Sequence, residues 1–380
     1  MQENHSQQRV HICFIISRAY HLFNPKTKEQ FGGSELQLYL LATEISKDSR
    51  FKVSFLVGDY GQGKIENYGR IVVYRGVYLD KGSSLFFKFV KGFELYRSLA
   101  KIDADIYFFS SANYFLGLLS FFCKINNKKI LFRTASDIDC NLQFIKKNLI
   151  LGRLFKYGLE SSDLVLTQSN DHQILLRKNH GIFAQILRNS ISLKTDSKKT
   201  YTKKHVLWVS SCQKLKRPTL FLKLAYENPT EKFVMICPPS SIDKEYWEII
   251  FQKSKNIPNL TFLKFVSFSK IQKYFHEAKI FVNTSEFEGF PNTFLQAGLM
   301  KIPILSLKVN PDHFISRYDC GYCCENDYRE MVVKFRKLIE NKKDWKKKSD
   351  EVFKYVHKYH DIDENIRRLK ILILNMKQNG

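Results

Sequence analysis

One stretch of the chain, residues 280–307, constrains the fold more than any other, because it reads as strand, loop, helix and strand in immediate succession. A short apolar run of β-forming residues opens it, and a polar, turn-prone segment follows. Pro291 has its φ preset for a first helical turn. Apolar side chains then recur at helical spacing until Pro303 stops the helix. The pattern predicts a βαβ unit, whose helix N-terminus lies at the carboxyl edge of a parallel sheet and attracts anions.

Two polar side chains fall at that predicted edge. Glu288 lies in the loop, and Gln296 lies about one and a half turns inside the helix, so both can face one crevice. Gly289 allows close approach of the backbone, and Asn292 or Thr293 would cap the helix. A carboxylate and a carboxamide placed in this way suit the hydroxyls of a sugar and a ribose on either side of a diphosphate. An ordinary βαβ crossover with a solvated Glu288 fits the spacing equally well.

The segment SEFEGFPNTFLQA resembles the signature of retaining GT-B glycosyltransferases of the family 4 type, the glycosyltransferase group 1 proteins. Residues 288–291 match that signature, whereas Gln296 stands where a second Glu is expected. The resemblance implies a catalytic role for Glu288. It also implies that this segment contributes a set of donor-binding residues: Gly289, Phe290, Pro291, Asn292 and Gln296. An amide can still exchange hydrogen bonds with ribose hydroxyls, so we expect the departure to affect donor affinity or nucleotide preference more than chemistry.

A second motif lies near the N-terminus, after an apolar run at residues 10–16. Gly32 and Gly33 open a predicted helix and would let backbone N–H groups approach a phosphate. Ser34 and Gln37 fit the spacing of a capping box. A Gly-Gly pair alone is usually only a turn, but GGSELQLYLLA is similar to the N-terminal GGxE…LA motif of the same family. The resemblance therefore implies that both glycines bind the donor.

A cluster of cations follows the apolar run at residues 205–210. Lys214, Lys216 and Arg217 would neutralise a diphosphate, although a solvated basic turn is the alternative. The family has a Gly-Arg pair here and a Lys five residues later. Lys216 matches that Lys, and Ser211 stands where the Arg is expected. The resemblance implies that Lys216 is catalytic and that Ser211 and Lys214 bind the donor. Arg217, which we also predict to be catalytic, or Lys214 would supply the missing charge.

Charged residues also follow a strand predicted at residues 129–133. Arg133, Asp137 and Asp139 lie just past its carboxyl end, where open α/β sheets bind ligands. A loop with solvated Asp residues is the alternative. In the family this region faces the acceptor and the transferred sugar, so we predict by position that the three residues lie on the acceptor side.

Residues 83–100 predict a helix that mixes Phe with Lys and Arg. One interpretation is a membrane-surface element, in which aromatic side chains enter the lipid and cations meet the headgroups. The other is a core helix with snorkelling lysines. We favour the core role, which does not exclude membrane contact.

The formal net charge of +24 predicts a polyanionic partner, which is a nucleic acid, an anionic membrane surface or a phosphate-rich substrate. A Lys-rich composition spread over solvated faces is the alternative. The chain carries no helix-turn-helix, zinc-finger or RNA-binding signature, and its cations are dispersed, so we expect no nucleic acid partner.

The eight cysteines form no disulfide framework, as expected for reduced cytosolic thiols. Cys320, Cys323 and Cys324 suggest zinc, but no second cluster or His pair completes such a site. We therefore expect neither a metal nor another cofactor. The sequence has no apolar signal core at its start and no run near the ~20 apolar residues that span a bilayer. We expect a cytoplasmic protein, with peripheral attachment to the inner face of the membrane as a further option.

At 380 residues the chain suits two domains of roughly 180 residues each. The resemblance implies an α/β fold of GT-B type, with two Rossmann-like domains facing a central cleft. We predict these parts by residue number: an acceptor-side domain at 1–190, a polar and basic linker at 191–204, a nucleotide-sugar donor domain at 205–360, and a final helix at 361–380 that packs back towards the N-terminal domain.

The resemblance implies a retaining hexosyltransferase that moves a sugar from a UDP- or GDP-sugar to a hydroxyl of a glycan or lipid-linked saccharide, in envelope or capsular polysaccharide biosynthesis. Lys216, Arg217 and the helix N-terminus after Glu288 would stabilise the leaving phosphate without a metal ion. The leaving phosphate takes the acceptor proton in front-face attack. A catalytically degenerate GT-B protein that acts as a scaffold is the alternative, and nucleic-acid binding is a less favoured one.

Overall fold

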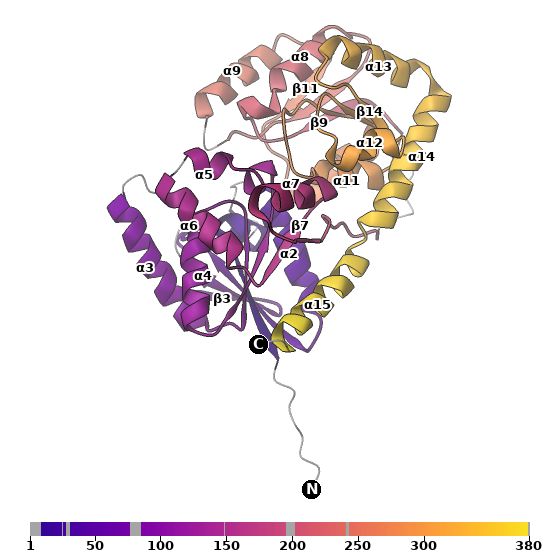
Figure 1. Ribbon diagram of the computed structural model, residues 1–380. Coiled ribbons are helices and arrows are strands. Elements are labelled where there is room, and N and C mark those ends of the chain that lie inside the picture. Colours follow the sequence, from indigo (N-terminus) through magenta and orange to yellow (C-terminus); the bar gives the residue numbers. More distant parts are fainter. Residues whose placement is uncertain are drawn as a thin grey trace. The chain divides into compact units, whose positions relative to one another are not determined.

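The protein divides into two compact units: unit 1 is Met1–Ser190 with Ile362–Gly380, and unit 2 is Ile191–Asp361 (Figure 1). The computed structural model describes the following residues: 9–24, 26–27, 31–76, 85–147, 149–194, 202–240 and 243–378. The predicted linker at 191–204 falls in unit 2, and its residues 195–201 lie outside the described part.

Unit 1 is organised around an eight-stranded sheet with the order β3-β4-β2-β1-β5-β6-β7-β8. Its strands are β1 (Val10–Ile15), β2 (Phe51–Val57), β3 (Ile65–Tyr68), β4 (Ile71–Arg75), β5 (Ile106–Ser110), β6 (Lys129–Arg133), β7 (Leu164–Thr167) and β8 (Gln185–Ile186). All neighbours are parallel except β3 and β4. The chain order reverses between β1 and β5, and such a switch point opens a crevice at the carboxyl ends of the strands.

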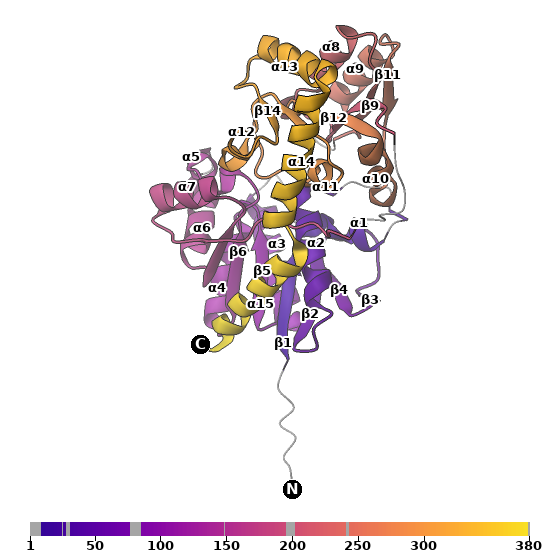
Figure 2. The same cartoon turned by 90° about the vertical axis from the view of Figure 1, so that its right-hand side faces the viewer.

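Helices cover both faces of this sheet (Figure 2). They are α1 (Tyr20–Phe23), α2 (Gly33–Ile45), α3 (Leu85–Ile102), α4 (Phe115–Ile125), α5 (Gln143–Lys147), α6 (Leu149–Glu160), α7 (Asn170–His180) and α15 (Ile362–Gln378). Along β1, Ile12 and Phe14 are buried in one core, and Cys13 and Ile15 in the other. A strand buried on both faces needs a continuous apolar run, which explains the sequence of β1.

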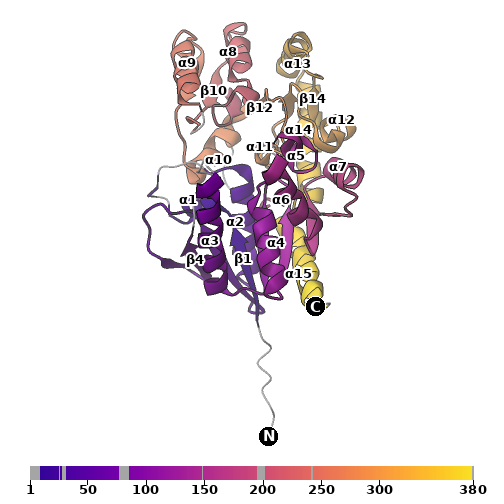
Figure 3. The same ribbon diagram turned by 60° about the vertical axis from the view of Figure 1, so that its left-hand side comes forward.

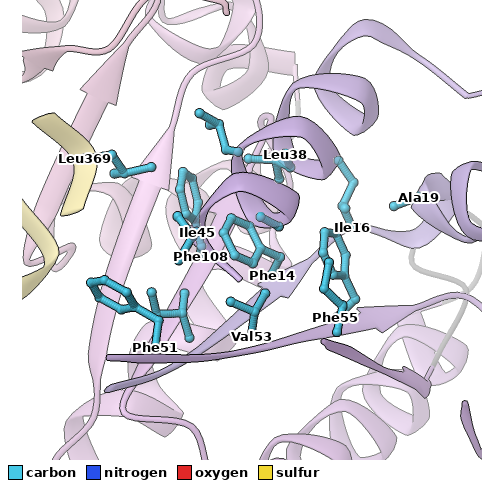
Figure 4. Packing of buried hydrophobic residues seen from close by; sticks show 14 of the residues in the cluster. Phe14, Ile16, Ala19, Leu38, Ile45, Phe51, Val53, Phe55, Phe108 and Leu369 are labelled. Atoms are coloured by element: carbon cyan, nitrogen blue, oxygen red, sulfur yellow. The ribbon is translucent and has the colours of Figure 1, made fainter. Parts of the chain in front are cut away.

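The first of these cores joins segments from both ends of the chain. Phe14 stacks between Phe55 and Phe108, with ring centroids 5.2 and 5.0 Å apart (Figure 4). Leu369 of α15 is buried in the same core as Leu38 of α2. Full burial of each such side chain contributes roughly 1.5–3 kcal/mol, so α15 is an integral part of unit 1.

Unit 2 is built on a six-stranded, wholly parallel sheet with the order β11-β10-β9-β12-β13-β14. Its strands are β9 (His205–Val209), β10 (Phe233–Ile236), β11 (Leu260–Leu263), β12 (Ala278–Asn283), β13 (Ile304–Ser306) and β14 (Gly321–Cys323). Its helices are α8 (Pro218–Tyr226), α9 (Lys244–Ser254), α10 (Phe268–Glu277), α11 (Asn292–Leu299), α12 (Phe314–Arg317), α13 (Tyr328–Glu340) and α14 (Lys342–Tyr359). The chain order reverses between β9 and β12, which sets a second switch point.

The βαβ unit predicted at residues 280–307 is confirmed as β12, α11 and β13. Gly298 explains how closely α11 packs on α14. A Cβ atom at this position would lie 2.5 Å from Val356 Cγ2 and 3.1 Å from the carbonyl oxygen of Val352. The absence of a side chain therefore fixes the distance between the two helices.

The sequence did not predict β3, which is an edge strand. Its four residues are exposed or partly exposed, and it pairs with β4 alone, in the antiparallel sense. A short polar edge strand has no apolar period by which it can be recognised.

The helix predicted at residues 83–100 is α3, and the first residues of the predicted range lie outside the described part. Leu95, Leu99 and Ile102 of α3 are buried in the second core of unit 1. The core interpretation is therefore confirmed for this side of the helix. Among the described residues, no helix combines the length and the apolar character needed to cross a membrane.

Candidate functional site

Lys216 and Glu288 meet at the carboxyl edge of the sheet in unit 2. Lys216 ends a 3-10 turn after β9, and Glu288 lies in the loop between β12 and α11. The Nζ atom of Lys216 lies 3.0 Å from Oε2 of Glu288. Because β9 and β12 are adjacent and parallel, their carboxyl ends bring the two loops together. The sheet thus joins the Lys and the Glu that the sequence proposed as catalytic.

The carboxylate of Glu288 is held on both oxygens. While Oε2 faces Lys216, Oε1 accepts hydrogen bonds from Asn283 Nδ2 at 3.0 Å and from Ser285 Oγ at 2.6 Å. Burial raises the pKa of Glu288, but the charge of Lys216 and the hydrogen bonds from Ser285, Asn283 and Lys216 together outweigh it, so the pKa lies below its ordinary value. Glu288 is therefore ionised at neutral pH and suits charge stabilisation rather than proton donation.

Thr284 fixes the lysine loop to the end of β12. Its hydroxyl donates to the carbonyl oxygen of Lys216 at 2.7 Å and accepts from Trp208 Nε1 at 3.0 Å. Both Thr284 and Trp208 are buried. The position of the Lys216 backbone therefore depends on a buried network that spans two strands.

Arg217 ties the same two loops together. Its Nε donates to the Thr284 carbonyl at 2.8 Å, its Nη2 to the Ser285 carbonyl at 3.0 Å, and its Nη1 to Asn326 Oδ1. The backbone of Arg217 is left-handed, with φ +47°, and burial lowers the pKa of its guanidinium. The guanidinium of Arg217 therefore braces the protein backbone, and its role at a phosphate stays a prediction.

The remaining residues of the lysine loop point elsewhere. Lys214 is exposed and lies 3.7 Å from Asp243 Oδ2. The hydroxyl of Ser211 accepts from Gln213 Nε2 at 3.0 Å. Of the cations predicted in this loop, Lys216 is the one that contacts Glu288.

The segment after Glu288 divides into core and edge. Phe290 is buried, with its ring centroid 5.1 Å from that of Phe314 and 4.6 Å from that of His360. Its ring therefore belongs to the core, and its role in donor binding stays a prediction. Gly289 is partly exposed, directly before this core residue.

The N-terminus of α11 differs in its cap from the prediction. Pro291 is the buried N-cap residue, with φ −63° and ψ 125° and no side-chain cap. Asn292 and Thr293, which the sequence proposed as caps, lie inside the first turn and are partly exposed. Gln296 lies one turn further and is also partly exposed. Its side-chain amide makes no hydrogen bond to any of the residues that the structure describes. Asn292 and Gln296 thus lie on the helix that Glu288 precedes.

In unit 1, a buried carboxylate organises the glycine pair. Gly32 is the N-cap of α2, and its N–H donates to Glu35 Oε2 at 2.9 Å, while Arg18 Nε donates to Glu35 Oε1 at 3.1 Å. The predicted box of Ser34 and Gln37 is wrong, because Glu35 closes the cap. The amide of Gly32 is thus bound to a side chain of the protein, and Gly33 is the first residue of α2. The role of both glycines in donor binding stays a prediction. A Cβ atom on Gly32 would lie 2.5 Å from Glu35 Oε2.

Two of the three predicted acceptor-side residues are buried. Arg133 donates through Nη2 to the Leu187 carbonyl at 3.1 Å and to Asn189 Oδ1 at 2.6 Å, and burial lowers its pKa to about 10. Asp139 accepts hydrogen bonds from three backbone amides, those of Ala112, Ala135 and Ser136. Burial raises the pKa of Asp139 despite these bonds. Both side chains hold the backbone of unit 1, and their place on the acceptor side stays a prediction.

Asp137 is the member of that trio that stays partly exposed. Its Oδ1 lies 2.9 Å from Nε2 of His172, whose Nδ1 lies 3.1 Å from the Thr134 hydroxyl. His172 and Thr134 are buried. The sequence analysis did not single out His172, because it lies on α7 and meets Asp137 only through the fold. A carboxylate aligned by a buried imidazole can accept a hydrogen bond from a ligand hydroxyl.

The cysteine group at residues 320–324 is packed into unit 2. Cys320 and Cys324 are buried, and Cys323 Sγ lies 3.5 Å from the Lys308 carbonyl. In the part of the chain that the structure describes, no group of three His, Cys, Asp or Glu side chains is placed to hold a metal ion.

A comparison with protein families matches residues 203–341 to Glycosyl transferases group 1. The matched segment lies within unit 2 and includes both Lys216 and Glu288. No curated protein matches the chain.

Solved structures share the fold at low sequence identity. Sucrose-phosphate synthase from Thermosynechococcus elongatus superposes with a TM-score of 0.80 at 13% identity, over 98% of this chain and 100% of that one. HepE from Anabaena, in complex with UDP and glucose, superposes with a TM-score of 0.74 at 14% sequence identity, over 97% of this chain and 100% of that one. A glycosyltransferase from Rickettsia africae superposes with a TM-score of 0.69 at 14% sequence identity, over 98% of this chain and 100% of that one. The predicted α/β fold of GT-B type, with two parallel-sheet domains, is confirmed.

Proposed function

We propose that this chain, in which residues 203–341 form a glycosyl transferases group 1 domain within a GT-B fold, is a retaining hexosyltransferase. It would move a sugar from a UDP- or GDP-sugar to a hydroxyl of a glycan or lipid-linked saccharide. The observation that carries the proposal is the contact of 3.0 Å between Lys216 and Glu288 beside the start of α11. A fixed cation, an ionised carboxylate and a helix N-terminus then lie at one sheet edge, which suits a sugar linked to a diphosphate.

The chemistry divides between these groups. The bond from the anomeric carbon to the diphosphate breaks, and a bond from that carbon to the acceptor oxygen forms on the same face. The acceptor proton passes to the leaving phosphate oxygen. Lys216 and the dipole of α11 offset the charge that grows on the phosphate. Glu288 orients the sugar hydroxyls or stabilises positive charge at the ring, and these fixed charges are the reason that we propose a metal-independent reaction.

The donor is proposed to be a UDP-sugar in the first place, because HepE, which shares the fold, binds UDP with glucose. Asn292 and Gln296 on α11 are the residues proposed to meet the donor from the helix side. The net charge of +24 supports an acceptor at an anionic membrane surface. We therefore place the protein in the cytoplasm at the inner membrane face, in the assembly of an envelope or capsular polysaccharide.

A degenerate scaffold is the second candidate function. Gln296 and Ser211 replace the Glu and Arg of the resembled signature, and Arg217, the neighbouring cation, is bound to backbone carbonyls. A protein of this kind would bind a nucleotide without transferring sugar.

Calorimetric titration with UDP, GDP and ADP, beside a short DNA duplex, tests the proposal. We expect micromolar binding of one nucleotide by the natural protein and its loss in Lys216→Ala. Hydrolysis or transfer from the matching nucleotide-sugar then separates the enzyme from the scaffold. Salt-sensitive DNA binding with no nucleotide binding contradicts both.

A further inference from the structure

Four helices on one side of the sheet in unit 1, the short α5 among them, form a continuous outer surface. Helix α4 contacts both α3 and α6, and α6 contacts the short helix α5; Figure 3 shows α3, α4 and α6 side by side. Their inner sides fill the second core of unit 1. We call the outer sides of α3, α4, α5 and α6 the basic-apolar face.

Large apolar side chains stand out from this face. Their exposed fractions are high in four cases: 61% for Phe93, 56% for Phe121, 70% for Leu149 and 63% for Ile150. Val90, Tyr96, Ile125 and Tyr157 of the same helices are exposed as well. Single exposed apolar residues are ordinary, but a group of them on adjoining helices marks an interaction surface.

Glycines join the outer sides of α4 and α6 into one surface. A Cβ atom on Gly117 would lie 2.2 Å from the carbonyl oxygen of Leu154, and one on Gly158 would lie 2.5 Å from the carbonyl carbon of Leu116. The two helices therefore approach to backbone contact. At that distance the outward residues of α4 and those of α6 are neighbours.

The same face carries positive charge without matching negative charge. Glu94 and Glu160 are the acidic residues of these four helices, and they lie 3.1 Å from Lys91 and 3.6 Å from Lys156 respectively. The structure gives no ion pair, in the described part of the chain, to the following cations of these helices: Arg97, Lys101, Lys124, Lys146, Lys147 and Arg153.

We propose that the basic-apolar face rests on an anionic phospholipid surface. Its apolar side chains enter the boundary of the acyl chains, and its unpaired cations meet phosphate headgroups. The inference rests on the proposed function for its purpose, since a lipid-linked acceptor lies in such a surface. The predicted acceptor side and the basic-apolar face are connected in the chain, because the turn Asp137–Asp139 leads into α5 and contacts it. The partly exposed Asp137 is thus close in the chain to the proposed lipid contact.

The chemistry of the face favours lipid over other partners. A second copy bound face to face would bring identical unpaired cations together, which opposes a symmetric dimer. A nucleic acid would suit the cations and could stack on Phe93 or Phe121, but Leu149 and Ile150, which are exposed at 70% and 63%, offer it neither stacking nor hydrogen bonds. Only a partner that is both anionic and apolar matches both kinds of side chain.

Sedimentation with lipid vesicles tests the proposal on the full chain. One set of vesicles contains phosphatidylcholine alone, and the other contains equal parts of phosphatidylcholine and phosphatidylglycerol. The apolar variant combines Phe93→Ser with Ile150→Ser, and the charge variant combines Lys124→Gln with Arg153→Gln. The control variant combines Ile174→Ser with Val333→Ser, since these side chains are also exposed, at 62% and 57%, but lie on α7 and α13.

The natural protein and the control variant are expected to bind the anionic vesicles and not to bind the vesicles of phosphatidylcholine alone. Loss of either pair of side chains is expected to weaken this binding by about tenfold. The proposal is overturned if the natural protein ignores anionic vesicles, or if the apolar and charge variants bind like the control. It is also overturned if the two variants change self-association or DNA binding while lipid binding stays constant.

Nucleotide titration of the same preparations separates this inference from the proposed function. All three variants are expected to bind the nucleotide with unchanged affinity, which also shows that they are folded. Vesicle binding with no nucleotide binding would remove the transferase and leave the lipid surface. Nucleotide binding with no vesicle binding would remove the lipid surface and leave the proposed transferase.

Discussion

The Nζ atom of Lys216 and the Oε2 atom of Glu288 lie 3.0 Å apart, although each residue is supplied by a different strand-to-helix connection of unit 2. A half-buried ion pair of this kind leaves one charge uncompensated when the other is removed. A bound diphosphate would give Lys216 a second anionic partner. The pair should therefore affect donor binding, the stability of the protein and the dependence of that stability on pH, and each effect can be measured.

Replacing Lys216 with Ala should weaken nucleotide binding by about tenfold to a hundredfold, because a charge-assisted hydrogen bond contributes roughly 1.5–3 kcal/mol. Calorimetric titration measures the change. Lys214→Ala is the matched control, since its exposed ammonium lies near Asp243 and not near Glu288. Equal losses in the two variants would contradict a special role for Lys216.

Replacing Glu288 with Gln should lower turnover by about a hundredfold while nucleotide affinity changes little, because the carboxylate acts on the sugar rather than on the nucleotide. The amide retains the size of the side chain and can still accept from Ser285. Steady-state kinetics with a saturating donor measures the effect. A variant with normal turnover would show that charge at this position is dispensable.

The depressed pKa of Glu288 also predicts a pH dependence of stability. A carboxyl group whose folded pKa lies below its unfolded value stabilises the protein above the unfolded value, which is about 4.3. That contribution is lost as the pH falls through the folded pKa. Denaturant unfolding of the natural protein and Glu288→Gln should therefore show a difference at pH 7 that shrinks in acid; a constant difference would argue against the ionised pair.

The two aspartates of the turn in unit 1 should behave in opposite ways. Asp139→Ala leaves three backbone amides without the buried carboxylate that accepts their hydrogen bonds, and should cost about 3 kcal/mol or more in the free energy of unfolding. Asp137→Ala removes a partly exposed carboxylate and should cost about 1 kcal/mol. Chemical denaturation separates them, and similar losses would mean that the burial of Asp139 is not what fixes this turn.

The fold was predictable because its strands and helices have local sequence patterns. The pair of Lys216 and Glu288 was predictable because it follows from a parallel sheet. Glu288 and Lys216 each follow an apolar run, and adjacent parallel strands bring their carboxyl ends together. Neighbouring residues were harder to predict. Arg217 directly follows Lys216, but its left-handed backbone turns the guanidinium onto the carbonyls of Thr284 and Ser285. A list of cations cannot show that turn.

Burial and long-range pairing account for the other features that the sequence could not show. Arg133 and Asp139 were expected near a ligand because of their place after a strand, and Phe290 because it matches the family signature, yet the side chains of all three are buried. Their side chains satisfy backbone groups or fill the core, and the sequence alone does not show which loops close over them. His172 was missed for the converse reason, since its contact with Asp137 joins two elements that are distant in the chain.

The place of α15 in the core of unit 1 has a consequence for biosynthesis. Unit 2 is one continuous segment, whereas unit 1 is assembled from segments on either side of it. During translation, unit 2 is complete before the ribosome has made Ile366, Leu369 and Ile373, which the first core of unit 1 needs. The N-terminal sheet therefore waits with part of one apolar side uncovered while the inserted unit folds. Nascent chains arrested before α15 should expose that side to chaperones and proteases.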